Sequence, residues 1–225
     1  MDKREVSERI QDVGIIPVVR ASSAQQALDA VDAVCAGGIP IVEITMTVPR
    51  AIEIIREVVR SRAGRVLVGA GTVLDARTAD ECVDAGADFV VSPGFDAATV
   101  ERVRQRGRLM MAGALTPTEV IAAWKAGSDF VKIFPCGQVG GASYIKALKA
   151  PLPQVPLVPT GGVNLNTAAD FIAAGAAALG VGGELVQAAA LKDGKTELIV
   201  EAAKKFIAVV AQAREASRPV VRSAT

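Results

Sequence analysis

The sequence predicts an α/β chain folded as a (β/α)₈ barrel, the TIM barrel, with an extra N-terminal helix. Short β-branched apolar runs alternate with longer amphipathic stretches from near the start to about residue 190. Eight such runs occur, and Gly or Ala-Gly ends several of the amphipathic stretches. Eight repeating units point to a closed parallel barrel, because closure covers both faces of every strand. A doubly wound open sheet is the alternative.

The first segment, Asp2–Val13, is charged and helical in pattern, and we expect it to pack beneath the barrel. The strands are then expected, in order, at Ile15–Val19, Ile41–Thr45, Val66–Ala70, Phe89–Ser92, Leu109–Ala112, Phe130–Phe134, Leu157–Pro159 and Ala178–Val181.

Helices are expected between the strands, at Ala24–Cys35, Ala51–Arg62, Ala76–Ala85, Ala97–Arg106, Thr118–Lys125 and Thr167–Ala174, with Thr196–Ala216 as the last. Polar residues that accept hydrogen bonds from a first helical turn stand ahead of five of them: Ser22, Asp75, Asp96, Thr116 and Asn164. No linker is evident, so residues 1–225 are expected to form one domain with a frayed tail after about residue 217.

Composition favours a small-molecule ligand over a polymer or a membrane. The formal charge is +1 with 22% charged residues, so neither nucleic acid nor an anionic membrane surface is an expected partner. The three cysteines form no CxxC pair, and the N-terminus lacks the apolar stretch of a signal peptide. No apolar run reaches membrane-spanning length. A cytoplasmic protein with reduced thiols is expected.

Histidine is absent from the chain. A histidine base, a Ser-His dyad and a histidine-bound metal are therefore excluded. Acid-base chemistry must use carboxylates, lysine, cysteine, tyrosine or bound water. No metal or other cofactor is expected.

Lys132 is the most informative residue, because it interrupts the apolar strand that Phe130 and Val131 begin. Barrel enzymes place their chemistry at the carboxyl ends of the strands. Desolvation disfavours the ammonium form of a buried lysine and so increases the neutral amine available as a nucleophile. Imine formation with a 2-keto acid needs such an amine. The structural alternative is a snorkelling lysine or a salt-bridge partner.

Glu43 repeats the anomaly, because it stands between Val42 and Ile44 in another strand expected to be covered on both faces. In a chain without histidine it is the leading candidate to move protons, through a water, during imine chemistry. A buried Lys132–Glu43 ion pair without turnover is the alternative, and such a pair costs more to bury than an apolar one.

Two glycine pairs follow the last two predicted strands: Gly161-Gly162 and Gly182-Gly183. Barrels of this kind often hold phosphate in the loops after strands seven and eight. Backbone N–H groups at a helix N-terminus, here one capped by Asn164, bind such anions. Tight turns alone are the alternative reading of either pair, but the paired placement favours phosphate.

Five segments, in this order, resemble the 2-keto-3-deoxy-6-phosphogluconate (KDPG) aldolases, which include 4-hydroxy-2-oxoglutarate aldolase activity: EITMTVP, VGAGTVLD, FVVSPGF, FVKIFPC and PTGGVN. The likeness spans roughly Gly14 to Lys204. It implies a metal-independent class I lyase that cleaves the phosphorylated keto acid to pyruvate and glyceraldehyde 3-phosphate. It also implies a homotrimer.

By this resemblance Lys132 is the Schiff-base lysine, Glu43 the acid-base residue and Thr72 a contact to the pyruvyl carboxylate. Arg20 would line the pocket, and Thr160, Gly161 and Gly162 stand where these aldolases hold phosphate. Pro93, in FVVSPGF, is counted with the substrate-binding residues at the same rim.

Three positions depart from the pattern of these aldolases. Thr47 stands where some relatives carry an arginine, so the carboxylate would rely on Arg20 and Thr72. Ala112 stands where a proline is common, and Gly183 where many relatives place a serine on the phosphate. The last change leaves backbone donors but removes a hydroxyl, which leaves open the choice among phosphorylated, epimeric and unphosphorylated keto acids.

Two other functions remain open. In a phosphate-binding barrel isomerase or synthase, Lys132 would act only as a charge. In a non-catalytic sugar-acid-binding barrel, the pocket would persist without turnover.

Overall fold

The computed structural model describes residues 1–62 and 64–217. Its strands are β1 Ile15–Val19, β2 Ile41–Thr45, β3 Leu67–Gly71, β4 Phe89–Val91, β5 Leu109–Ala114, β6 Phe130–Ile133, β7 Leu157–Pro159 and β8 Leu179–Val181. The helices are α1 Lys3–Val13, α2 Ala24–Ala36, α3 Ala51–Arg62, α4 Ala76–Asp84, α5 Ala97–Gln105, α6 Pro117–Lys125, α7 Ala142–Lys149, α8 Ala168–Ala173, α9 Ala188–Lys192 and α10 Glu197–Ala216, with a 3-10 turn, η1, at Gly137–Val139.

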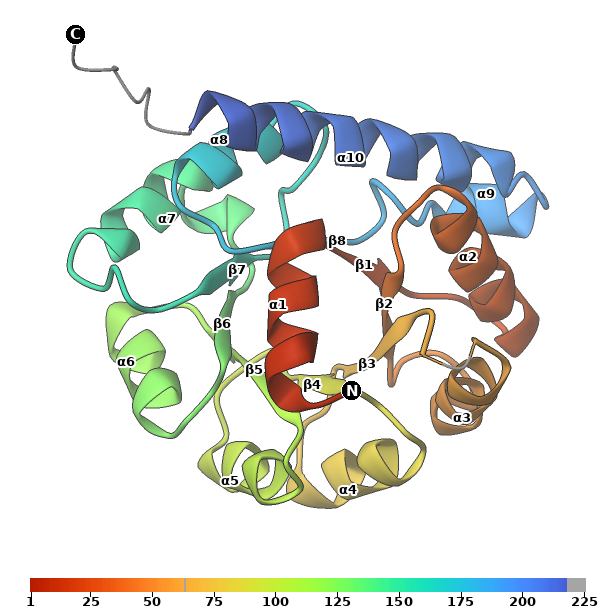
Figure 1. Cartoon of the computed structure of the whole chain (residues 1–225), viewed down its shortest axis with the longest axis horizontal. Helices are drawn as coiled ribbons and strands as arrows, with labels where there is room; N and C mark the ends of the chain where they lie inside the picture. The colour runs from red at the N-terminus through yellow and green to blue at the C-terminus, as the bar shows by residue number, and fades with distance from the viewer. Residues whose placement is uncertain (63, 218–225) are drawn as a thin grey trace, which may run out of the picture.

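The strands form one parallel barrel in chain order, with β1 paired to both β2 and β8. Figure 1 shows the strands at the centre and helices α2 to α10 around them. Strand pairing is weakest between β7 and β8, where a single isolated β-bridge joins Thr160 to Gly180. The predicted (β/α)₈ barrel is therefore confirmed, and the open sheet is wrong.

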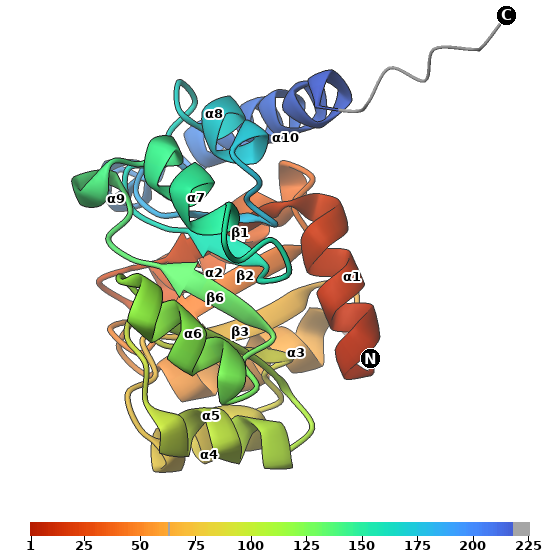
Figure 2. The same cartoon turned by 90° about the vertical axis from the view of Figure 1, so that its left-hand side faces the viewer.

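Helix α1 is confirmed as the extra helix, and it crosses the end of the barrel where the strands begin (Figures 1 and 2). Asp2 and Glu5 form a capping box at its start, and Gly14 ends it in the left-handed conformation. Its apolar residues Val6 and Ile10 are buried, which closes this end of the barrel. The opposite end is thus the one left for a site.

Inside the barrel, glycines make room for large neighbours. Gly69 on β3 lies beside the Phe89 ring, which occupies the space that a side chain at position 69 would need. Phe89 is fully buried. Gly69 and Phe89 are paired residues of β3 and β4. The Phe89 ring therefore fills both its own space in the core and the space that a side chain at position 69 would occupy.

Local start signals were mostly predicted correctly. Asp75, Asp96 and Thr116 each accept a hydrogen bond from the backbone N–H three residues on. Ser22 was wrong as a cap: Ser23 caps α2, and the Ser22 hydroxyl donates to the Gln26 side chain instead. The frayed tail predicted after residue 217 lies outside the described residues.

Helices α7 and α9 and the turn η1 were not predicted. Gly140 and Gly141, which precede α7, both have positive φ. Glycine by itself does not indicate that a helix begins, so α7 could not be predicted from these residues. Within residues 1–62 and 64–217, none of the helices combines the length and hydropathy that crossing a membrane requires.

Candidate active site

Lys132 and Glu43 meet inside the barrel near the carboxyl ends of the strands. Lys132 lies on β6 and Glu43 on β2, and Lys132 Nζ is 3.6 Å from Glu43 Oε1. The side chains are 5% and 3% exposed, so both charges are withdrawn from water. Breaking such a pair by removing one partner leaves a buried charge without compensation, at a cost of about 3–5 kcal/mol. Each of these two buried groups therefore depends on the other to balance its charge.

One oxygen of Glu43 is free to act on another group. Glu43 Oε1 is buried, and no described residue lies within hydrogen-bond distance of it as a donor. Buried carboxylate oxygens are usually satisfied by hydrogen bonds. Lys132 Nζ is the nearest cation in the described ion pairs, slightly beyond hydrogen-bond length. This oxygen can therefore accept a proton or a hydrogen bond from a molecule that reaches the amine.

Gly71, at the end of β3, sets the position of Glu43. A Cβ at position 71 would overlap the Glu43 carboxylate, with Oε1, Cγ and Cδ as its three nearest atoms. The φ of Gly71 is not positive, so space rather than backbone conformation is the constraint. The second glycine of VGAG is thus part of the site, although its position at the end of a strand was the only feature of the sequence that indicated this.

We expect Gly71→Ala to lower kcat by about 100-fold, because a side chain displaced by about 1 Å loses that much rate. Steady-state kinetics and a thermal melt measure the effect and the fold. Gly94→Ala is the matched control, since nothing lies within 4 Å of a Cβ there. A Gly71→Ala protein with the kcat of the parent would contradict this role for glycine.

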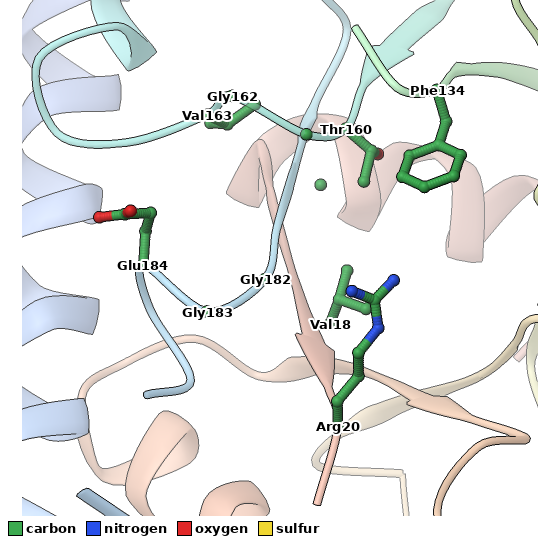
Figure 3. Close-up of a pocket in the computed structure, with 11 residues that line it drawn as sticks. Val18, Arg20, Phe134, Thr160, Gly162, Val163, Gly182, Gly183 and Glu184 are labelled. Atoms are coloured by element: carbon green, nitrogen blue, oxygen red, sulfur yellow. The ribbon is translucent and has the colours of Figure 1, made fainter. Parts of the chain in front are cut away.

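A cavity of about 140 Å³ opens at the same end of the barrel. It is lined by Val18, Arg20, Phe134, Thr160, Gly161, Gly162, Val163, Gly180, Gly182, Gly183 and Glu184. Six predicted substrate- or phosphate-binding residues come together in it: Arg20, Thr160 and the two glycine pairs. Figure 3 shows the Arg20 guanidinium reaching up toward Thr160 and Phe134.

Phe134 connects this cavity to the buried pair. It lines the cavity, and Lys132 Nζ lies 5.5 Å from the centre of its ring, within cation–π range. Val18, also in the lining, is in register with Glu43. Lys132 and Glu43 are not in the lining themselves, but each lies next to a residue that is. Phe134 was predicted only as an apolar strand residue, so its contact with the amine was missed.

Thr47, which stands in the predicted substrate-binding segment EITMTVP, and Pro93 lie around this centre. Thr47 and Arg20 line an adjoining cavity of about 410 Å³, and the Thr47 hydroxyl is 2.7 Å from that of Thr45. Pro93 packs over Gly113, whose missing side chain leaves room for the Pro93 carbonyl. Gly113 is in register with Lys132, so Pro93 reaches the rim next to the amine.

Thr72 follows β3 and Gly71, and its φ is +59°. A branched residue rarely adopts this left-handed conformation, and such strain gathers at functional sites. The strain is consistent with a binding role for Thr72, which stays a prediction.

The two glycine pairs differ in what their backbones require. Gly161 and Gly162 have φ of +86° and +78°, so glycine is needed for the turn itself. Gly182 and Gly183 do not have positive φ, and nothing lies within 4 Å of a Cβ at either. The second pair therefore borders open space rather than a tight turn.

The backbone N–H groups of all four glycines have no acceptor among the described residues. The prediction that Asn164 caps the following helix was wrong, because α8 begins at Ala168. The Asn164 side chain instead accepts from the N–H groups of Asn166 and Thr167 in the intervening turn. Any anion at the first pair would be held by loop N–H groups, not by a helix end.

Cys136 lies two residues beyond Phe134 and is buried. Burial raises the pKa of the Cys136 thiol to about 11, so it stays protonated and is not a nucleophile near neutral pH. Within residues 1–62 and 64–217, Cys, Asp and Glu side chains form no group of three that could hold a metal ion.

These features define the class of the protein: a barrel enzyme whose amine and carboxylate are buried together under a cavity at the carboxyl ends of its strands. The sequence matches the family described as KDPG and KHG aldolase over residues 6–202. The chain therefore belongs to the KDPG and KHG aldolase family, as the sequence motifs predicted.

Individual relatives agree with this family. The chain is 37% identical to the 2-dehydro-3-deoxy-phosphogluconate aldolase of Treponema pallidum, over 75% of this chain and 80% of the relative. The KDPG aldolase of Legionella pneumophila, solved with pyruvate captured as a covalent carbinolamine intermediate, is 28% identical over 89% of this chain and 97% of its own, with a TM-score of 0.83. A designed cage built by fusing symmetric oligomeric domains is 30% identical over 91% of this chain and 74% of its own, also with a TM-score of 0.83.

Proposed function

We propose that this chain is a class I aldolase that cleaves 2-dehydro-3-deoxy-6-phosphogluconate to pyruvate and glyceraldehyde 3-phosphate. The observation that carries the proposal is the buried Lys132–Glu43 pair, 3.6 Å apart, beneath the cavity that Phe134 and Thr160 line. Family membership and the carbinolamine of the Legionella relative support the same chemistry.

In this mechanism Lys132 first passes a proton to Glu43, and the neutral amine then attacks the C2 carbonyl of the keto acid. A proton moves from the nitrogen to the oxygen, which completes the carbinolamine. Glu43 protonates the carbinolamine oxygen, water leaves, and an imine forms. Glu43, now ionised, takes the proton of the C4 hydroxyl, directly or through a water. The C3–C4 bond breaks with its electrons moving to the iminium nitrogen, and the aldehyde departs. Protonation of the enamine at C3 and hydrolysis release pyruvate and restore both groups.

The remaining predicted residues bind the substrate in this proposal. Arg20 and Thr72 hold the pyruvyl carboxylate, with Thr47 and Pro93 beside them at the rim. Thr160 and the N–H groups of the four glycines receive the phosphate end. The free donors at Gly161 and Gly162 and the open space at Gly182 and Gly183 support this assignment.

The proposal is tested by pyruvate release, followed with a coupled dehydrogenase assay, from the phosphorylated keto acid and from 4-hydroxy-2-oxoglutarate. The second substrate is the alternative named in the family description. A protein that is thermally stabilised by these acids but releases no pyruvate would be a binding barrel, and the aldolase proposal would be abandoned.

We expect the cleavage rate to be unchanged after exhaustive treatment with a chelator, because an amine and a carboxylate supply all the chemistry of the proposed steps. The measurement compares kcat before and after chelation and after adding back divalent metals. Activity that disappears with the chelator and returns with a metal would contradict a class I mechanism.

We also propose a homotrimer, which the family resemblance implies. The similarity to a domain used in a symmetric oligomeric cage supports self-association. Light scattering behind a sizing column measures the mass directly, and a monomer or a dimer would contradict it.

A further inference from the structure

A glutamate borders the cavity proposed to receive the phosphate. Glu184 follows Gly183 directly and lines the cavity together with the two glycine pairs. It is also an exposed residue that borders a second hollow, toward α10, with Glu201 and Lys205. One side of the proposed phosphate pocket is thus negatively charged.

No described cation forms an ion pair with this carboxylate. Glu184 forms no hydrogen bond or ion pair within residues 1–62 and 64–217. Arg20 is the one cation among the residues that line the cavity in the described part of the chain. Figure 3 shows Arg20 and Glu184 on different sides of the pocket, with the Glu184 carboxylate turned away from the guanidinium. The charge of Glu184 therefore stays unpaired at the edge of the space beside the glycines.

The charge matters because the possible substrates differ at this end. A phosphate ester carries about −1.5 to −2 charges at pH 7 and offers only acceptor oxygens when fully ionised. A carboxylate carries one charge, and a terminal hydroxyl carries none and can donate a hydrogen bond to Glu184. Repulsion beside Glu184 is thus largest for phosphate, smaller for carboxylate and absent for a hydroxyl.

We propose that Glu184 is a specificity-determining residue that shifts this enzyme away from keto acids ending in phosphate and toward those ending in a hydroxyl. The proposal rests on the proposed aldolase function and adds a rule for the substrate class. The glycine N–H groups still attract an anion, so Glu184 sets the ratio between substrates and does not forbid the phosphorylated one.

The test compares the parent with Glu184→Gln, which removes the charge and keeps the shape. The values of kcat/KM are measured for 2-keto-3-deoxy-6-phosphogluconate, 4-hydroxy-2-oxoglutarate and unphosphorylated 2-keto-3-deoxygluconate. The ratio of phosphorylated to unphosphorylated kcat/KM is expected to rise about five- to tenfold, the effect of one partly solvated charge on a dianion. The rise in kcat/KM that Glu184→Gln causes should be smaller for 4-hydroxy-2-oxoglutarate than for the phosphorylated acid.

Ionic strength gives an independent readout. Salt screens exposed charges over about 10 Å at 0.1 M. Adding salt should therefore raise the same ratio in the parent more than in Glu184→Gln. A loss of structure would not produce this salt dependence of the substrate ratio. A thermal melt of Glu184→Gln checks that the variant is folded.

Glu201→Gln is the matched control. Glu201 is an exposed glutamate on α10 that borders the second hollow with Glu184, does not line the glycine cavity, and pairs with Lys204. An unchanged ratio in Glu184→Gln, or an equal rise in Glu201→Gln, would overturn the proposal. If the parent releases no pyruvate from any of the three acids, the aldolase function itself fails instead.

Discussion

Borohydride added to this protein in the presence of pyruvate is expected to leave one reduced pyruvate on Lys132 and to abolish activity. The reductant converts the imine to a stable secondary amine, which peptide mass spectrometry locates. Lys132 is suited to this reaction because it lies beside Glu43 in a site that water hardly reaches. Modification at other lysines alone, or none at all, would count against a Schiff base.

Lys132→Arg should lower kcat by about four to six orders of magnitude, the loss that follows removal of a covalent nucleophile. Arginine keeps a positive charge beside Glu43, so the buried carboxylate is not left alone. Product formation that survives this change in good part would favour the isomerase or synthase reading, in which Lys132 is only a charge. Lys132→Met provides a second variant if the larger guanidinium disturbs packing.

Lys149 is the matched control for both experiments. Its side chain is also partly withdrawn from water, and burial lowers its pKa. Its Nζ donates to the carbonyls of Pro153 and Val155, away from the cavity. Lys149→Arg should therefore retain both trapping and turnover. Equal trapping on Lys149 and Lys132 would show that burial alone, and not the site, selects the amine.

Glu43→Gln is expected to lower kcat by about 10²- to 10⁴-fold, the usual contribution of a positioned acid-base group. The amide keeps the shape of the side chain but cannot exchange a proton at these steps. Both imine formation and bond cleavage should slow, so rapid-quench trapping with pyruvate would show a lower rate of adduct formation. The free Oε1, which has no described donor, makes this carboxylate the one available to the substrate.

Glu43→Gln also leaves Lys132 without its charged partner, so we expect a lower thermal midpoint with the fold retained. Glu53→Gln, at an exposed pair with Arg50 on α3, is the control and should change neither kcat nor stability appreciably. A Glu43→Gln protein that turns over at the parent rate would remove Glu43 from the mechanism.

Much of the barrel was predictable because its signals are local. Strand β2 matched its predicted bounds, since the β-branched residues of Ile41–Thr45 follow Pro40 and end where a turn begins at Met46. Helix α7 was missed because its start depends on two glycines whose positive φ values are set by the fold around them. Strand β3 began one residue later than predicted, because pairing with Ile41 of β2 starts at Leu67.

The two central residues of the site were also predictable, and for one reason. Lys132 and Glu43 are charges inside apolar strands, a placement whose cost needs a partner or a function. Glu184 carried no such signal: a glutamate after a glycine pair reads as an ordinary surface residue until the loop is seen to border a cavity.

The sequence by itself determined the strand and helix order, the absence of histidine chemistry, and the two charges that must be buried. Only the tertiary structure decided that these charges lie 3.6 Å apart, that Gly71 leaves the space Glu43 occupies, and that Phe134 lies over the amine. Periodicity and composition act within a few residues, whereas the contacts of Glu43 join β2 to β3 and to β6. They exist because closing the barrel brings the carboxyl ends of all its strands to one rim.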